Sequence, residues 1–391
     1  MAKTESLVIK RKFSNILLVY VVIFLLPIIE SSLNLSLGAN WQIYYPFIFI
    51  SAFLFLLKGT IKKKYAAVFA LFLILTTISM VVGLLWYQDL TLSEIMVSQI
   101  NRYEWRLLVE YIRFIMCLLF FTVVMELINT RERLHAASVV FLLGVILQGI
   151  YGLYEFFVKY FKLDLLLLNG KAIAFENIRI YGTFYEPSQY GLFFVVGFFF
   201  FRLFNVFFVD SYSGRISVML FRHRFVVNIL LMLVLLFSMS RAAMAILVVL
   251  IGIWFIISLK LKFSHFEIRL FGTLVCLSCI SYFLFLAESF DQVVSIFFNS
   301  ENPNNFISRV GSTFDAINIF SRNINLYLVG TGPGSTFFEY GIMGAFFRFL
   351  LEQGLLMFAL VLVFFARVGF MILLLDFSRA QKKALFLFFC S

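Results

Sequence analysis

Long apolar stretches dominate the chain and predict helices that cross a membrane. A helix needs roughly 20 apolar residues, at about 1.5 Å of rise per residue, to span a hydrocarbon core of about 30 Å. We therefore predict an all-α polytopic membrane protein with about 10–11 transmembrane helices, in which residues 1–391 form a single integral membrane domain. The apolar runs lie at about 13–29, 41–57, 65–87, 107–128, 136–158, 188–209, 225–239, 242–259, 270–287 and 345–366, and a further run begins near 384.

The composition excludes a water-soluble domain. Of the 391 residues, 62% are hydrophobic and only 14% are charged, whereas soluble domains carry about 25% charged residues. The chain also holds 54 Phe and 17 Tyr, more apolar area than one soluble core of this size can bury. Lipid must therefore solvate much of the surface.

The two ends of the chain differ in character. Lys10-Arg11-Lys12 leads into the first apolar run with no small-residue cleavage pattern behind it, so we expect an uncleaved first span. The last run stops at Ser391, too soon to cross a membrane. Either the chain is shorter than its relatives or this tail lies in the membrane interface.

The net charge of +11 follows the predicted topology. With the amino terminus in the cytoplasm, most Lys and Arg residues fall in cytoplasmic connections, as the positive-inside rule requires. The positive charge therefore needs no nucleic-acid partner. The two long connections, 159–187 and 288–344, fall on the outer side, and compact bundles do not need connections of this length for packing alone. We expect any chemistry in these two loops, together with short helices.

The residue types left for an outer site are carboxylates and arginines. All three histidines, His135, His223 and His265, fall in cytoplasmic connections. The four cysteines lie within apolar runs, where we expect them to be buried, and the large outer loops contain no Asp-x-Asp motif. We therefore expect no metal ion and no cofactor, and an anionic substrate would be neutralised by arginine.

The first candidate motif runs from Arg179 to Pro187 and reads R-I-Y-G-T-F-Y-E-P. Pro187 suits the first turn of the next helix, which places Glu186 at the helix mouth. Glu186 could simply cap the helix while Arg179 snorkels to the headgroups. Alternatively, the carboxylate stands opposite the guanidinium and deprotonates a hydroxyl beside an anion, with Tyr181 and Tyr185 contacting the substrate. The outer position favours the second reading.

The second motif, Ser238–Ala243, breaks two apolar runs with Arg241. We expect a tight hairpin there, in which Arg241 either forces the turn or meets a lipid phosphate. The third motif combines Arg309 and Arg322 with the glycine cluster Gly330–Gly334. This cluster lacks the Lys and Ser/Thr of a nucleotide site, so it forms either a plain turn or a segment whose N–H groups, including that of Gly332, meet an anion.

Ionisable residues within the apolar runs are costly and indicate either function or a packed ion pair. Arg348 and Glu352 stand four residues apart on one predicted helical face, and the outer position of Arg348 favours substrate contact. Glu110 and Arg113 stand three apart, and we expect a structural pair. Glu155 falls near the outer end of its run.

In their order and topology, the three motifs resemble the bacterial superfamily of O-antigen polymerases (Wzy) and O-antigen ligases. The matching segments are Arg179–Pro187, Ser240–Ala243, and G-T-G-P-G followed by L-L-E-Q-G-L-L within Gly330–Leu356. The resemblance implies a GT-C-like glycosyltransferase of the bacterial inner membrane with two large periplasmic loops. Ligases carry a His shortly before the L-x-E-x-G segment, where this chain reads Gly341-Ile342-Met343-Gly344-Ala345. Its absence favours the polymerase.

The implied reaction polymerises undecaprenyl-pyrophosphate-linked oligosaccharide repeat units into O-antigen or a related surface polysaccharide. By this resemblance Glu186, Arg179 and Arg241 are catalytic, and Arg309, Arg322, Arg348, Tyr181, Tyr185, Gly332 and Glu352 contact the pyrophosphate or glycan. The expected partners are the lipid-linked oligosaccharide, membrane lipid and a chain-length regulator protein. The alternatives are an O-antigen ligase acting on lipid A core and, in another class, a lipid-linked oligosaccharide flippase. A flippase would place its charges around a midplane cavity, often with internal repeats, and the sequence contains no such repeat.

Overall fold

The structure is a computed structural model that describes a little over half of the chain. The described residues are 16–26, 35–36, 40–41, 45–56, 63–86, 100–163, 180, 182–184, 187–208, 214–238, 240, 324–332 and 345–374, with single positions in 243–251 and 378–388. They fall into two compact units. Unit 1 comprises Met1–Ser51, Leu127–Leu284 and Gly369–Ser391, and unit 2 comprises Ala52–Glu126 and Phe285–Val368.

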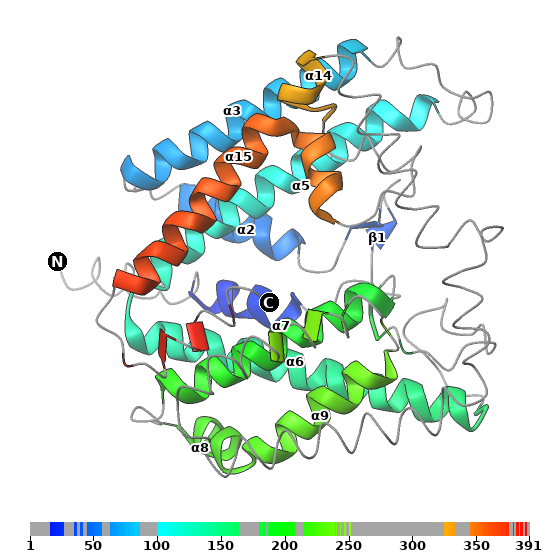
Figure 1. Cartoon of the computed structure of the whole chain (residues 1–391), viewed down its shortest axis with the longest axis vertical. Coiled ribbons are helices and arrows are strands. Elements are labelled where there is room, and N and C mark those ends of the chain that lie inside the picture. Colours follow the sequence, from blue (N-terminus) through cyan, green and yellow to red (C-terminus); the bar gives the residue numbers. More distant parts are fainter. Residues whose placement is uncertain are drawn as a thin grey trace, which may run out of the picture. The chain divides into compact units, whose positions relative to one another are not determined.

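Helices form the described part of the chain almost entirely (Figure 1), as the hydrophobic pattern predicts. Unit 1 is built around α6 (Arg131–Tyr160), α7 (Pro187–Phe207), α8 (Arg215–Arg222) and α9 (Arg224–Phe237), with an apolar helix at Ile16–Leu25. It also holds the antiparallel pair β1 (Leu35–Ser36) and β2 (Asn40–Trp41). Unit 2 is built from α3 (Lys63–Trp86), α5 (Ile100–Leu127), α14 (Ile324–Val329) and most of α15 (Ala345–Leu374). The helix α2 (Tyr45–Leu56) begins in unit 1.

Four helices of the described residues are long and apolar enough to cross a membrane. These spans are Leu107–Leu127 of α5, all of α6, Gln189–Phe207 of α7 and Phe349–Val368 of α15. The helices α8 and α9 are long and apolar enough only when taken together, and they meet at 70°. They provide a fifth candidate if the pair forms a single broken span. The all-α membrane architecture is thus as predicted. Of the other predicted spans, 270–287 lies outside the described residues and 242–259 is described at a few positions only.

The helix α6 shows why these helices form and how they pack. Thr130 caps its start by accepting a hydrogen bond from the Arg133 N–H at 3.3 Å, and Glu132 and Lys159 suit the two ends of the helix dipole. One face is buried at Leu142, Val145, Gly149 and Gly152, which follow a helical repeat. This face packs on α7 and α9, so these three helices form the core of unit 1.

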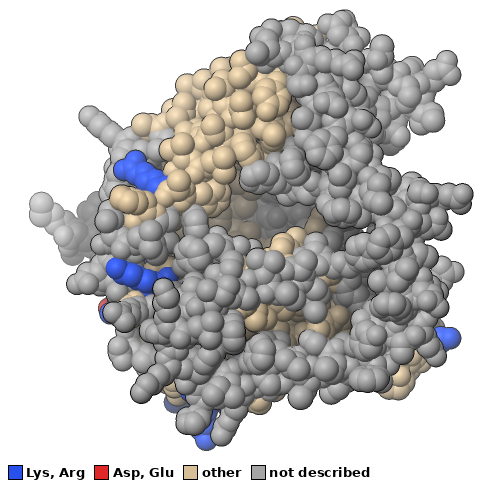
Figure 2. All heavy atoms as spheres, in the orientation of Figure 1, with Lys and Arg blue, Asp and Glu red and all other residues tan. Residues whose placement is uncertain are grey.

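The opposite faces of the spans present apolar side chains outward, as a lipid-solvated helix does. On α6 the exposed stripe includes Leu147, Ile150, Tyr154 and Phe157. In unit 2 a similar stripe follows α3, and Figure 2 shows an area of uncharged side chains over α3 and α15. Such continuous apolar surface indicates contact with lipid rather than water.

Two expectations from the sequence need correction. The helix α6 continues to Tyr160, so Lys159 belongs to this helix and not to the loop predicted to begin there. Cys117 is exposed rather than buried, because it faces outward from α5, where lipid solvates a small apolar side chain as well as a protein core does.

Candidate functional site

A buried ion pair on α6 anchors the first sequence motif. Glu155 Oε1 lies 2.6 Å from Lys159 Nζ, and the two side chains are 0% and 1% exposed. The other carboxylate oxygen, Oε2, accepts a hydrogen bond of 2.7 Å from the backbone N–H of Gly182. Because Lys159 neutralises the charge and Gly182 uses a remaining acceptor, Glu155 can stay ionised away from water. The carboxylate therefore fixes the loop that contains R-I-Y-G-T-F-Y-E-P.

A second polar contact holds the same loop about two turns closer to the start of α6. The amide group of Gln148 donates to Thr183 Oγ1 at 3.0 Å, and the Tyr190 hydroxyl donates to the Gln148 carbonyl at 3.0 Å. All three side chains are buried. The loop is thus tied to α6 at Gly182 and Thr183, and α6 is tied to the first turns of α7 through Tyr190.

The conformation of Gly182 explains why the motif contains glycine. Its φ is +58°, in the left-handed region that residues with a Cβ rarely adopt. A Cβ at this position would also meet the ring of Tyr190, with Cδ2 at 2.8 Å. Phe184 then packs against Tyr190 with ring centroids 5.5 Å apart, so the turn is seated on aromatic side chains.

The second motif is joined to the first in the same unit. The backbone N–H of Ile180 donates to the Phe237 carbonyl, at the end of α9, with a distance of 3.3 Å. At the start of α7, a Cβ added to Gly191 would lie 2.7 Å from Ser240 Cβ and 2.8 Å from Ala243 Cβ. The R-I-Y-G-T-F-Y-E-P loop and the S-R-A-A break therefore both adjoin the packed ends of α7 and α9: Ile180 bonds to the last residue of α9, and Ser240, three residues further on, lies against Gly191 of α7.

Ser238 and Ser240 shape the break itself. Ser238 Oγ donates to the Leu235 carbonyl at 2.6 Å and accepts from the Ser240 N–H at 3.3 Å. Ser240 Oγ accepts from the Ala243 N–H at 3.2 Å, which is the geometry of a helix N-cap. The break is thus a capped helix start that follows the end of α9 within three residues.

Replacing the cap tests this assignment. Ser240→Ala should lower the free energy of unfolding by about 1 kcal/mol, because the Ala243 N–H loses its acceptor. Ser240→Asp should restore part of that stability, since aspartate also caps helices. Denaturation of the purified protein by SDS in mixed micelles, followed by circular dichroism, measures the difference. Equal stability of Ser240→Ala and the unmodified chain would argue against the cap.

The third motif lies in unit 2, where its glycines make a packed turn. The Gly332 N–H donates to the Glu352 carbonyl at 2.9 Å and to Ser79 Oγ at 3.0 Å, and Ser79 Oγ donates to the same carbonyl at 2.6 Å. The N–H groups of Gly330 and Thr331 bond to the carbonyls of Leu326 and Leu351. These three N–H groups are therefore occupied within the protein, which favours the plain turn over the anion-binding segment for Gly332.

The turn docks against a break in α15. Gly354 has φ +76° and ψ 167°, so the helix is interrupted there. Glu352 and Gln353, just before the break, are 8% and 4% exposed. The break lies two residues beyond Glu352, so positions 348 and 352 belong to the same helical stretch, as predicted. The backbone carbonyl of Glu352 accepts the hydrogen bond from the glycine turn.

The remaining predicted site residues have side chains outside the described residues: Arg179, Tyr181, Tyr185, Glu186, Arg241, Arg309, Arg322 and Arg348. Only the backbone of Arg348 is described, within α15. The expected structural pair is confirmed on α5, where Arg113 Nη1 lies 2.6 Å from Glu110 Oε1. Among the residues that the structure describes, no cluster of His, Cys, Asp and Glu could hold a metal ion.

Several residues that hold the motifs in place were not predicted from the sequence, namely Gln148, Lys159 and Tyr190 in unit 1 and Ser79 in unit 2. Lys159 gave a usable signal, since it stands one helical turn after Glu155 in an apolar stretch, the spacing of an ion pair. The other three gave none, because their partners lie far away in the sequence. Comparison of the chain with protein-family models, curated proteins and solved structures found no match.

Proposed function

We propose that the chain is a membrane glycosyltransferase of the O-antigen polymerase type. It would join undecaprenyl-pyrophosphate-linked oligosaccharide repeat units into O-antigen or a related surface polysaccharide at the periplasmic face of the inner membrane. The amino terminus would lie in the cytoplasm, and a chain-length regulator would act as a partner. The sequence resemblance provides the substrate and the reaction.

One structural observation supports the proposal: the first two motifs both adjoin the end of α9. Arg179 is covalently next to Ile180, whose N–H bonds to the Phe237 carbonyl at the end of α9. Arg241 follows Ser240, which comes three residues after Phe237 and lies against Gly191 of α7. The two arginines, 62 positions apart in the sequence, are thus each next to a residue at this end of α9. A shared site for one anionic substrate would need such neighbouring segments.

The chemistry demands stabilisation of a pyrophosphate leaving group. A guanidinium donates two parallel hydrogen bonds to phosphate oxygens and stays charged at any physiological pH. Two such groups held on fixed segments would stabilise the charge that develops as the glycosidic bond to pyrophosphate breaks. Glu186 would take the proton from the acceptor hydroxyl. Glu155 is unsuited to that role because its carboxylate is buried and already bonded to Lys159 and Gly182.

Polysaccharide analysis of a strain that lacks the gene tests the proposal. The unmodified gene should restore a ladder of polymer lengths, whereas Arg179→Ala and Arg241→Ala should reduce polymer by about 10²–10³-fold while single repeat units persist. Lys162→Ala is a matched control, because Lys162 is an exposed cation beyond the end of α6. It should leave the ladder unchanged.

The same gels distinguish the alternatives. Polymer that accumulates on its lipid carrier in the deletion strain would identify a ligase. Repeat units trapped on the cytoplasmic side, with polymer length unchanged in the arginine variants, would identify a flippase. A normal ladder in both arginine variants would overturn the proposed site.

A further inference from the structure

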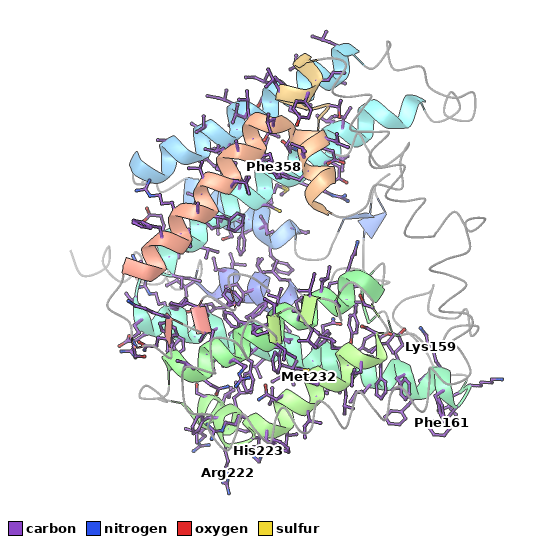
Figure 3. The ribbon with its side chains drawn as sticks, viewed as in Figure 1. Lys159, Phe161, Arg222, His223, Met232 and Phe358 are labelled. Carbon is purple, nitrogen blue, oxygen red and sulfur yellow. The ribbon has the colours of Figure 1, made fainter. Side chains whose placement is uncertain are left out.

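The proposed function does not explain the orientation of the short helix α8 or its exposed apolar and cationic side chains. It meets α9 at 70°, with His223 at the junction (Figure 3). The helix α9 packs along α6 and α7, both of which are long enough to span the membrane. If α9 lies within the bilayer alongside them, a bend of this size turns α8 toward the membrane plane.

One face of α8 is fixed to the rest of unit 1. Ser217 and Leu220 are buried, and Ser217 Oγ lies 3.2 Å from His135 Nε2 at the start of α6. The His135 ring in turn stacks on Phe204 of α7 and meets the ring of Phe208, just past the end of α7, edge to face, with centroids 5.5 and 4.9 Å away. The helix is therefore held in a defined orientation at the ends of two spans.

The other face of α8 combines exposed apolar and cationic side chains. Met219 is 62% exposed, and Ile216 and Val218 are about half exposed. Arg215 and Arg222 are also exposed and flank Met219 on one side of the helix, at spacings of four and three residues. Figure 3 shows Arg222 pointing away from the helices. Three large apolar side chains are costly in water but suit the boundary between headgroups and acyl chains.

The segment that forms α8 and α9 carries charge of one sign. The sequence contains no acidic residue between Asp210 and Glu267, and Arg224 adds a further cation, its guanidinium 4.7 Å from the ring centroid of Phe221. This segment belongs to the side that the overall charge bias assigns to the cytoplasm, where bilayers expose anionic lipid. Cationic side chains above an apolar face match that surface in both charge and polarity.

We propose that α8 is an interfacial helix that binds anionic phospholipid through Arg215 and Arg222 while Met219, Ile216 and Val218 enter the acyl-chain boundary. The occupant is the lipid surface of the same membrane. The inference goes beyond the proposed glycosyltransferase function and does not depend on it.

Site-specific quenching tests the proposal in the full-length chain. Bimane is attached to Met219→Cys in a background in which the four native cysteines are serine. The protein is reconstituted in mixtures of phosphatidylglycerol and phosphatidylcholine in which either lipid carries brominated chains. Brominated phosphatidylglycerol should quench the label with more than about tenfold preference over its share of the lipid, at about fivefold per arginine.

Charge variants separate lipid selection from simple burial. Arg215→Gln/Arg222→Gln should bring the preference close to one, whereas Arg215→Lys/Arg222→Lys should keep most of it. Lys162→Gln, which removes an exposed cation at the opposite end of α6, should leave it unchanged. Equal quenching by both lipids with the two arginines present, or stronger quenching by aqueous iodide than by either brominated lipid, would overturn the proposal.

Discussion

Glu155→Ala should destabilise unit 1 more than any other single change on α6. It removes the partner of Lys159, whose side chain is 1% exposed, and the acceptor of the Gly182 N–H. Breaking a buried ion pair from one side costs about 3–5 kcal/mol, because the remaining charge stays away from water without compensation. SDS titration from mixed micelles should show a loss of stability of this order.

Two companion variants assign that loss to its causes. Glu155→Leu/Lys159→Leu removes both charges and should recover most of the stability, since an apolar pair fits this buried position. Glu155→Gln keeps an acceptor for the Gly182 N–H but leaves Lys159 unpaired, so it should stay well below the double variant. If the double variant were no more stable than Glu155→Ala, the ion pair would not be the source of the loss.

The same variants bear on the proposed activity. The Glu155 carboxylate acts on the substrate only through the loop that it holds, so it is a positioning residue. The double leucine variant should fold yet lose polymer, because the Gly182 N–H has no acceptor and the segment next to Arg179 is less constrained. A full polymer ladder from the double leucine variant would show that anchoring of the loop by Glu155 is not needed for polymerisation, and Glu155 would not be a positioning residue.

The hydrophobic pattern predicts the spans because of one rule: a helix that lipid surrounds is apolar along the length of the span. The runs at 107–128, 136–158 and 188–209 correspond to α5, α6 and α7, since a helix in lipid must be apolar over most of its surface. The rule fails at helix ends. The helix α6 continues through Lys159 because Glu155 neutralises it, so charge marks the end of an apolar run without marking the end of the helix.

The candidate site is less accessible to sequence reasoning because its contacts are long-range. The sequence identifies the R-I-Y-G-T-F-Y-E-P and S-R-A-A segments separately, but the Ile180–Phe237 hydrogen bond, which ties the first segment to the end of α9 just before the second, spans 57 positions. The Ser79–Gly332 contact in unit 2 spans 253 positions. Residue type indicates that Ser79 can donate and accept a hydrogen bond, but not where its partner lies.

Gly354→Ala should lower the stability of unit 2 by an amount comparable to the loss expected for Glu155→Ala in unit 1. Gly354 adopts φ +76° and ψ 167°, a combination that only glycine reaches without strain. A Cβ there would lie 2.5 Å from the Leu328 carbonyl oxygen and from the Gly330 nitrogen, both backbone atoms that cannot rotate away. Strain and overpacking together should cost about 3 kcal/mol or more.

The loss should appear as disruption of the docked turn, and not of α15 alone. The Gly332 N–H and Ser79 Oγ both bond to the Glu352 carbonyl, two residues before the break, so a shift of Gly354 displaces their acceptor. Hydrogen exchange followed by mass spectrometry should show faster exchange in peptides that contain Thr331 and Gly332. The second half of α5, in the same unit, should be affected much less, whereas Leu107 in its first half lies against Gly332.

Gly214→Ala is the matched control, because Gly214 has an extended backbone with φ −171° and the nearest atom to an added Cβ is Ser217 Oγ at 3.8 Å. It caps α8 without a side chain, so alanine should cost less than about 1 kcal/mol. Both substitutions add one methyl group and remove the same backbone freedom from the unfolded chain. The difference between them therefore isolates the positive φ and the close backbone contacts of Gly354. Equal stability of the two variants would mean that α15 continues unbroken through Gly354. The contact between the glycine turn and a break in α15 would then be wrong.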